Sequence, residues 1–324
     1  MGEENAKRVF FNKVLGEPYE PKTKEIDVTA LRALICVKRR PDDFDFYSRG
    51  QVPPGVRFLT AGQDSRSTQL HYTVWGWGLR RKVDGTTALC GWLIDWGLIE
   101  RSYSLTFETS EYHVFDELIY RRPFPSSVSE RNYYVSQCGH DIGWQPTQIP
   151  IVHYVRSWPN RAFAIKGASE TPSSAVRADY MRLGNSIAVR IGDETIRDAA
   201  TQPWLCNTYQ IKCEWYGMID RRIEVPGQEG SPVKVPLITL PENVDDEWVK
   251  QSCSEFLVPG EKKNELVWKH RGPNHYADCN TYAHGLALNL NPSQLDLTDD
   301  EASAAEVVHV PPASVEETHD PSFS

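Results

Sequence analysis

Two aspartates stand where a strand or a helix would present a carboxylate to a shared site. Asp64 follows the apolar run Val56-Arg-Phe-Leu-Thr-Ala61 and precedes a second strand-like segment, so we expect it at a strand end. Asp278 lies in Asn274-His-Tyr-Ala-Asp-Cys279, at the start of an expected helix. Each also has an ordinary explanation, because aspartates are common in turns and stabilise the first turn of a helix.

Carboxylates brought together from distant parts of a chain suit the hydrolysis of a phosphodiester. Hard divalent cations prefer carboxylate oxygens, and two ions about 3.5–4 Å apart can activate a water and stabilise the leaving oxygen. Such a site draws its acids from separate elements, of which Asp64 and Asp278 supply two. The seven cysteines form no CxxC pair, so neither a zinc knuckle nor a disulfide framework is expected.

The hydrophobic pattern in the first half predicts an antiparallel meander followed by alternating helices and strands. Strands are expected over residues 56–61, 69–77 and 87–96, because apolar residues alternate or run together there between turns. Helices are then expected over 111–122 and 147–158, and strands over 132–137 and 161–166. This order predicts an α/β fold with a ribonuclease-H-like mixed sheet, in which antiparallel hairpin strands join parallel strands and helices flank both.

The second half has a less regular pattern. Strands are expected over residues 187–191 and 211–222, with a helix over 193–200 between them. A helix with acids in its first turn is expected over 245–257, a short strand over 266–270 and a final helix over 275–290.

The net charge of −9 comes from the C-terminal end of the chain. Eight of the 44 acids lie between Asp296 and Ser324, where there is no Lys or Arg, which leaves 36 acids against 35 basic residues. The body is therefore nearly neutral, and its basic clusters at Lys38-Arg39-Arg40, Arg80-Arg81-Lys82 and Arg221-Arg222 are either solvated surface or part of a DNA groove.

No stretch approaches the roughly 18 apolar residues that a membrane span needs, and the first residues include no apolar signal region. We therefore expect a cytoplasmic protein without membrane association.

Five motifs, in order, resemble the nuclease half of lambda-type (GpA family) tailed-phage terminase large subunits. They are Val52-Pro-Pro-Gly-Val-Arg-Phe-Leu-Thr-Ala-Gly-Gln-Asp64, Val74-Trp-Gly-Trp-Gly78, Trp92-Leu-Ile-Asp-Trp-Gly97, Ala164-Ile-Lys-Gly167 and Asn274-His-Tyr-Ala-Asp-Cys-Asn-Thr-Tyr282. The opening Phe11-Asn-Lys-Val-Leu-Gly-Glu-Pro-Tyr19 looks like the exit from that family's packaging ATPase, and Gln251-Ser-Cys-Ser-Glu255 looks like the helix before its last catalytic segment. The resemblance covers roughly residues 10–290.

The resemblance implies a ribonuclease-H-like domain that binds Mg²⁺ or Mn²⁺, as two ions, through acids and hydrolyses duplex DNA. The first family acid falls on Asp64 and the last on Asp278. The middle acid departs from the family pattern, because Gln137 or Ser136 occupies its expected place in Tyr134-Val-Ser-Gln-Cys-Gly-His-Asp141. Either Asp141 replaces it from a few residues downstream, or the second ligand is missing.

Three further residues are candidates for supporting roles. His140 and His275 flank the expected acids, where they could orient water or touch phosphate, or be ordinary hydrogen-bonded histidines. Lys166 follows an apolar strand and precedes Gly167, where it is either a DNA contact or a surface lysine at a strand end.

The resemblance divides the chain into three parts. Residues 1–54 are an N-terminal arm or linker resembling an ATPase exit, 55–292 are the nuclease domain, and 293–324 are an acidic tail expected to be disordered.

The expected function is a metal-dependent endonuclease that cleaves concatemeric double-stranded phage DNA during genome packaging. No GxxxxGK[ST] phosphate loop occurs in the sequence, so the ATPase is expected on another chain. The other expected partners are the small terminase subunit and the portal, in the cytoplasm of an infected bacterium. One alternative is a catalytically silent DNA- or portal-binding module with the same fold. Another is a different ribonuclease-H-like nuclease such as a junction resolvase.

Overall fold

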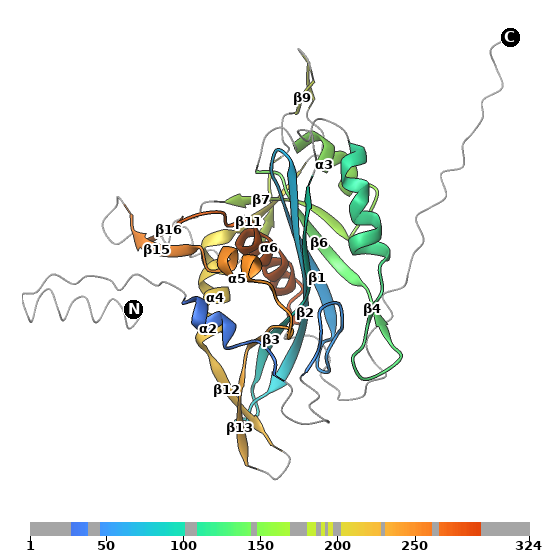
Figure 1. Cartoon of the computed structure of the whole chain (residues 1–324). Coiled ribbons are helices and arrows are strands. Elements are labelled where there is room, and N and C mark those ends of the chain that lie inside the picture. Colours follow the sequence, from blue (N-terminus) through green and yellow to red (C-terminus); the bar gives the residue numbers. More distant parts are fainter. Residues whose placement is uncertain are drawn as a thin grey trace, which may run out of the picture.

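A computed structural model describes residues 27–37, 46–100, 109–143, 148–168, 180–185, 189–191, 194–196, 202–227, 231–260 and 266–292 (Figure 1). The strands are β1 (Phe58–Ser65), β2 (Gln69–Arg81), β3 (Thr87–Glu100), β4 (Phe124–Pro125), β5 (Asn132–Tyr133), β6 (Val135–Asp141), β7 (Ala162–Ala168), β8 (Met181–Leu183), β9 (Val189–Ile191), β10 (Glu194–Ile196), β11 (Trp204–Asn207), β12 (Arg222–Pro226), β13 (Pro232–Pro236), β14 (Ile238–Thr239), β15 (Glu255–Pro259) and β16 (Leu266–His270). The helices are α2 (Val28–Arg32), the 3₁₀ helix η2 (Thr109–His113), the π-helix η3 (Asp116–Arg121), α3 (Gln148–Val155), α4 (Thr208–Asp220), α5 (Asp246–Ser252) and α6 (His275–Asn289).

An eight-stranded mixed sheet forms the centre of the molecule, in the order β14-β3-β2-β1-β6-β7-β11-β8. Strands β1, β2 and β3 are antiparallel neighbours, whereas β6 runs parallel to β1 and β7 runs parallel to β6. The predicted mixed sheet, with antiparallel hairpin strands followed by parallel ones, is confirmed. The hairpin strands are longer than the pattern predicted, because their pairing continues beyond the apolar runs.

Helices cover both faces of this sheet. Figure 1 shows α4, α5 and α6 on one side and α3 on the other. On the α6 side, Thr60 donates to the carbonyl of Ala283 at 2.7 Å and Trp75 donates to Asn280 at 3.0 Å. Because both faces are covered, β2 is buried without interruption from Leu70 to Gly78.

The tryptophans of the hairpin strands belong to the core. Trp75, Trp77, Trp92 and Trp96 are each at most 1% exposed. Trp75 packs edge-on against Trp215 of α4, with ring centroids 4.6 Å apart. These rings therefore join the sheet to its helical layer.

Three predictions in the second half are wrong. The helix predicted over 245–257 ends at Ser252, and residues 255–257 belong to β15 instead. Residues 211–222, predicted as a strand, fall mainly in α4, which Asn207 caps by accepting from the backbone N–H of Gln210. Ile211, Trp215 and Ile219 recur at helical spacing on its buried face, and this periodicity outweighs the strand preference of individual residues. Residues 194–196, predicted as helix, form β10 paired with β9 instead.

Part of the predicted N-terminal arm packs into the same core as the sheet. Leu31, Leu34, Tyr47 and Val52 are at most 2% exposed within it. Residues 1–26 and 38–45, and the predicted tail 293–324, lie outside the described residues. Within the described part of the chain, no helix is both long and apolar enough to span a membrane.

Candidate functional site

Strands β1 and β6 deliver two acids to the same edge of the sheet. Their parallel register pairs Gln63 with His140, so Asp64 and Asp141 are the next residues along the two strands. Neighbouring strands lie about 4.8 Å apart. The register therefore explains why two acids that are 77 positions apart in the sequence meet.

Both side chains face α6. A Cβ at Gly62 would lie 2.0 Å from the carbonyl oxygen of Cys279, so this side of β1 lies directly against α6, and Asp64 follows on the same side. The hydroxyl of Tyr282 on α6 donates to Asp141 at 3.0 Å, and the backbone N–H of Gly143 donates to the same oxygen at 3.0 Å.

Asp278 joins these two acids from the first turn of α6. The pKa of Asp141 is raised to about 8. Burial of the carboxyl is the largest cause, and the negative charges of Asp64 and Asp278 also raise this pKa. Asp278 and Tyr282 are four residues apart on α6, so they share one face of the helix, and the Tyr282 hydroxyl reaches Asp141. The three acids therefore all belong to the space between the ends of β1 and β6 and the first turns of α6.

The structure brings Asp141, and not Gln137, to this place. Gln137 pairs with Thr60, four positions before the end of β6, and the side-chain oxygen of Gln137 is buried without a hydrogen-bond partner among the described residues. Asp141 ends the strand beside Asp64.

A buried lysine that the sequence analysis missed holds Asp278. The ammonium of Lys212, on α4, donates to Glu255 at 2.6 Å and to Asp278 at 3.0 Å. Its side chain is 10% exposed. Burial alone would lower the pKa of Lys212, but the charges of Asp278 and Glu255 hold that pKa above its usual value. Lys212 is therefore a charged counter-ion to both acids.

Asn274 completes this arrangement. Its amide donates to Glu255 at 2.9 Å and to the second oxygen of Asp278 at 3.0 Å. Tyr216 donates to Glu255 at 3.2 Å. Asp278 is thus fixed through both of its oxygens. Lys212 was missed because its segment was predicted as a strand, whereas Glu255 and Asn274 lay within the quoted motifs without an assigned role.

Two histidines adjoin Asp64. His275 Nδ1, on α6, lies 2.7 Å from the Asp64 carboxylate and 3.2 Å from Arg66 Nε. One nitrogen cannot donate to Asp64 and accept from Arg66 at once, so these two contacts belong to different tautomers. His71, on β2, pairs with Asp64 in the antiparallel register and stacks on His275 with ring centroids 4.3 Å apart.

His140 and Lys166 do not join the acids. His140 is fully buried on the opposite face of the sheet, where it contacts the Tyr120 hydroxyl at 2.8 Å and Gln63 at 3.3 Å. A fully buried imidazole cannot touch a phosphate, so His140 is an ordinary hydrogen-bonded core histidine. Lys166 is exposed, but alternation along β7 turns it away from α6, because its neighbour Gly167 faces Tyr282.

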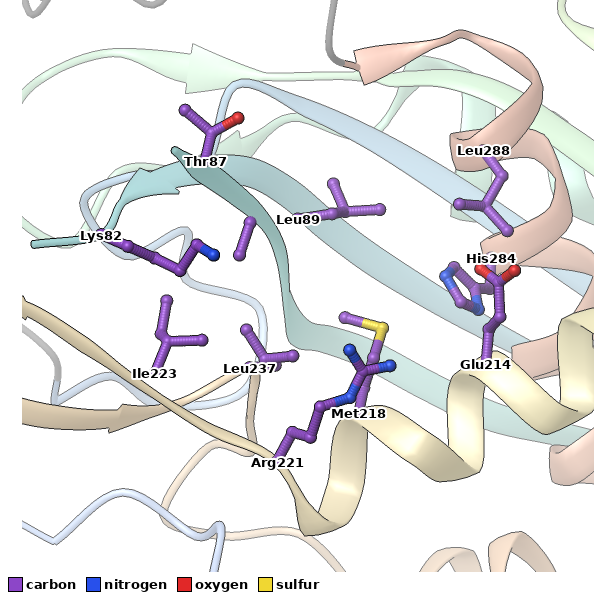
Figure 2. Close-up of a pocket in the computed structure, with 11 residues that line it drawn as sticks. Lys82, Thr87, Leu89, Glu214, Met218, Arg221, Ile223, Leu237, His284 and Leu288 are labelled. Carbon is purple, nitrogen blue, oxygen red and sulfur yellow. The ribbon is translucent and has the colours of Figure 1, made fainter. Parts of the chain in front are cut away.

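A separate pocket of about 280 Å³ lies between α4, α6 and the start of β3 (Figure 2). Lys82 and Arg221 line it, so two of the basic clusters meet there. Lys82 directly follows β2 and lies 11 residues beyond His71, which is roughly 35 Å in an extended strand. These clusters therefore do not border the acids.

Comparison with known proteins identifies the family of this chain. Residues 1–297 match the family described as the terminase large subunit gpA endonuclease domain. The chain is 26% identical to the terminase large subunit of Escherichia phage lambda over 307 residues. This aligned region covers 92% of this chain and 41% of the lambda protein. The crystal structure of the large terminase nuclease from thermophilic phage G20c gives a TM-score of 0.36 at 10% identity, over 84% of this chain and 100% of that one.

The chain thus spans about two fifths of the length of the lambda protein. Because the family match extends over most of the sequence, the assignment covers the sheet, α6 and the acids together. The chain belongs to the family of terminase large subunit gpA endonuclease domains.

Proposed function

We propose that this protein is a metal-dependent endonuclease that cleaves concatemeric double-stranded DNA during phage genome packaging. The observation that supports this most directly is that Asp64 and Asp141 end neighbouring parallel strands and face α6, the helix that carries Asp278 in its first turn. The family supplies the nuclease role.

The residues present fit a divalent cation. Asp64 and Asp141 are buried, and the pKa of Asp141 is raised first by this burial and then by the negative charges of Asp64 and Asp278. Oxygen donors of this kind favour hard cations such as Mg²⁺ or Mn²⁺. A bound cation would supply a Lewis acid that polarises the phosphodiester and lowers the pKa of a water molecule.

The chain's own groups position the carboxylates. Tyr282 and the backbone of Gly143 orient Asp141, while Lys212 and Asn274 orient Asp278. Donors that are already in place reduce the reorganisation needed when substrate binds. Two ions shared among these acids would suit an in-line displacement at phosphorus.

The test is cleavage of plasmid DNA. We expect cutting with Mg²⁺ or Mn²⁺, none with EDTA, and a loss of at least about 100-fold in Asp64→Asn and Asp278→Asn, because each change removes a charge that holds the cation. Asp84→Asn is the matched control, since Asp84 lies in the exposed turn between β2 and β3 and bonds only locally to Lys82 and Thr86. Unchanged cutting in Asp64→Asn would contradict the site. Complete absence of cutting by a folded, metal-loaded protein would favour a silent DNA- or portal-binding module.

We further propose that the partners are double-stranded DNA, a packaging ATPase, the small terminase subunit and the portal, in the cytoplasm of an infected bacterium. The ATPase is expected outside these 324 residues, which include no phosphate loop. Its docking is best tested by removing residues 1–26 alone, because Leu31, Leu34 and Tyr47 belong to the core. Co-purification with the ATPase that survives this deletion would contradict a docking role for the arm.

A further inference from the structure

Asp64, His71 and His275 form a second group of possible metal ligands beside the three carboxylates. One donor atom from each lies within 4.8 Å of the other two. They come from β1, β2 and α6, and the β1–β2 register places His71 directly opposite Asp64. The fold thus adds two imidazoles to an acid that the proposed nuclease site already uses.

The surroundings of His71 leave its imidazole without an evident structural role. The residue is 2% exposed, and Nδ1 has no hydrogen-bond partner among the described residues. Its ring lies between His275, stacked at 4.3 Å, and the edge of Tyr276 at 5.2 Å. Buried polar atoms normally have partners, so the unpartnered nitrogen of a histidine ring that adjoins Asp64 leaves this ring available to a ligand.

We propose that Asp64, His71 and His275 form a subsite that binds a divalent transition metal through one carboxylate and two imidazole nitrogens. Asp64 also belongs to the proposed carboxylate site with Asp141 and Asp278, so the two metal positions share it. Imidazole suits transition metals, whereas Mg²⁺ strongly prefers oxygen ligands. The subsite therefore selects Mn²⁺ over Mg²⁺. This inference rests on the proposed metal-dependent cleavage, because both positions use Asp64.

Arg66 occupies the approach to this subsite. Its Nε lies 3.2 Å from His275 Nδ1 and 3.7 Å from the Asp64 carboxylate. Its side chain is 47% exposed, so it can turn toward solvent when a metal ion binds. In the metal-free protein the guanidinium partly neutralises Asp64.

The decisive experiment is pulsed electron paramagnetic resonance of the full chain with Mn²⁺ and no DNA. The wild-type protein, prepared with ¹⁴N- or ¹⁵N-labelled histidine, should show coupling to two histidine nitrogens. His71→Gln and His275→Gln should each lose one of them, and Mn²⁺ affinity should fall on the order of tenfold or more while Mg²⁺ affinity changes little. His113→Gln is the control, because His113 is half exposed and pairs with Asp116 away from this group.

The wild-type spectrum alone can overturn the inference, so a variant that fails to fold does not obscure the result. Saturating Mn²⁺ without histidine coupling would contradict the subsite. Such a spectrum from a protein that still cuts DNA would leave the proposed function intact. Histidine coupling in a protein that cannot cut DNA would support the subsite and contradict the nuclease.

Discussion

Lys212 carries a full positive charge in a nearly closed environment because Glu255 and Asp278 both face it. Such a group stabilises a fold only while its partners remain, since a buried charge without a counter-ion is costly. The lysine therefore sets both the stability of this region and the position of Asp278.

Replacing Lys212 by Met should lower the free energy of unfolding of the metal-free protein by about 3 kcal/mol. The reason is that the buried Glu255 and the partly buried Asp278 then lose their counter-ion. Unfolding by urea in EDTA measures this loss. The double variant Lys212→Met, Glu255→Gln should recover part of it by removing one of the uncompensated charges. Equal stability of wild type and Lys212→Met would show that the ammonium is not a counter-ion.

Asp141 should make the metal-free protein less stable as pH rises. Its folded-state pKa of about 8 exceeds the unfolded value of about 3.9, so the folded chain binds this proton more tightly. The resulting stability is present below about pH 4 and is lost as pH rises through about 8. Asp141→Asn should lack this dependence, so urea unfolding curves in EDTA should favour the variant increasingly between about pH 5 and pH 8. Parallel pH profiles for the two proteins would contradict the assignment.

Sequence reasoning proposed Asp64 and Asp278 because each stands at an expected strand end or helix start and the family resemblance places an acid at each position. It left the middle acid open, since only the parallel register of β1 and β6 brings Asp141, and not Gln137, beside Asp64. His71 could not be identified as a neighbour of Asp64 without the length of the hairpin, which fixes that pairing.

At the scale of elements, the contact between β1 and α6 determines the geometry of the site. Gly62 permits it, because any side chain there would meet the backbone of Cys279. The helix carries His275, Asp278 and Tyr282, so its distance from the sheet sets how those groups meet Asp64 and Asp141.

Gly62→Ala should therefore reduce both stability and cleavage. A Cβ 2.0 Å from the Cys279 oxygen forces α6 away from β1, at a cost of about 1–3 kcal/mol for overpacking. Thermal unfolding and plasmid cleavage measure the two effects. Gly272→Ala is the control, because a Cβ there meets nothing within 4 Å. Full activity in Gly62→Ala would show that the site tolerates a displaced helix.

The hairpin strands and α6 could be predicted because their apolar patterns are long and their ends are marked by turn or capping residues. α4 was assigned wrongly because its aromatic and β-branched residues resemble a strand when read singly. Their spacing on the buried face identifies the helix. That error hid Lys212, whose partners become apparent only once α4 lies beside α6.

At the scale of the whole molecule, most of the net negative charge lies at the C-terminal end of the sequence. Residues 296–324 include eight acids and no Lys or Arg, whereas the rest of the chain is nearly neutral. Carboxylates carry the same sign of charge as DNA phosphates and repel them over a distance that shortens as the ionic strength rises.

Removing residues 296–324 should strengthen DNA binding at low salt and leave the affinity at high salt nearly unchanged. A salt series of binding measurements on both forms checks this. Replacing the eight acids by their amides at full length separates the effect of charge from that of length. Affinity that is independent of the deletion at every salt concentration would indicate that these acids do not act on DNA.

The most direct measurement of the central claim is anomalous diffraction from crystals soaked in Mn²⁺. The proposed nuclease requires a peak within about 2.0–2.6 Å of carboxylate oxygens of Asp64 and of at least one of Asp141 and Asp278. Asp64→Asn crystals should lose or weaken that peak. Mn²⁺ bound only elsewhere, with these three carboxylates free of metal at saturating concentration, would contradict a metal-dependent nuclease at this site.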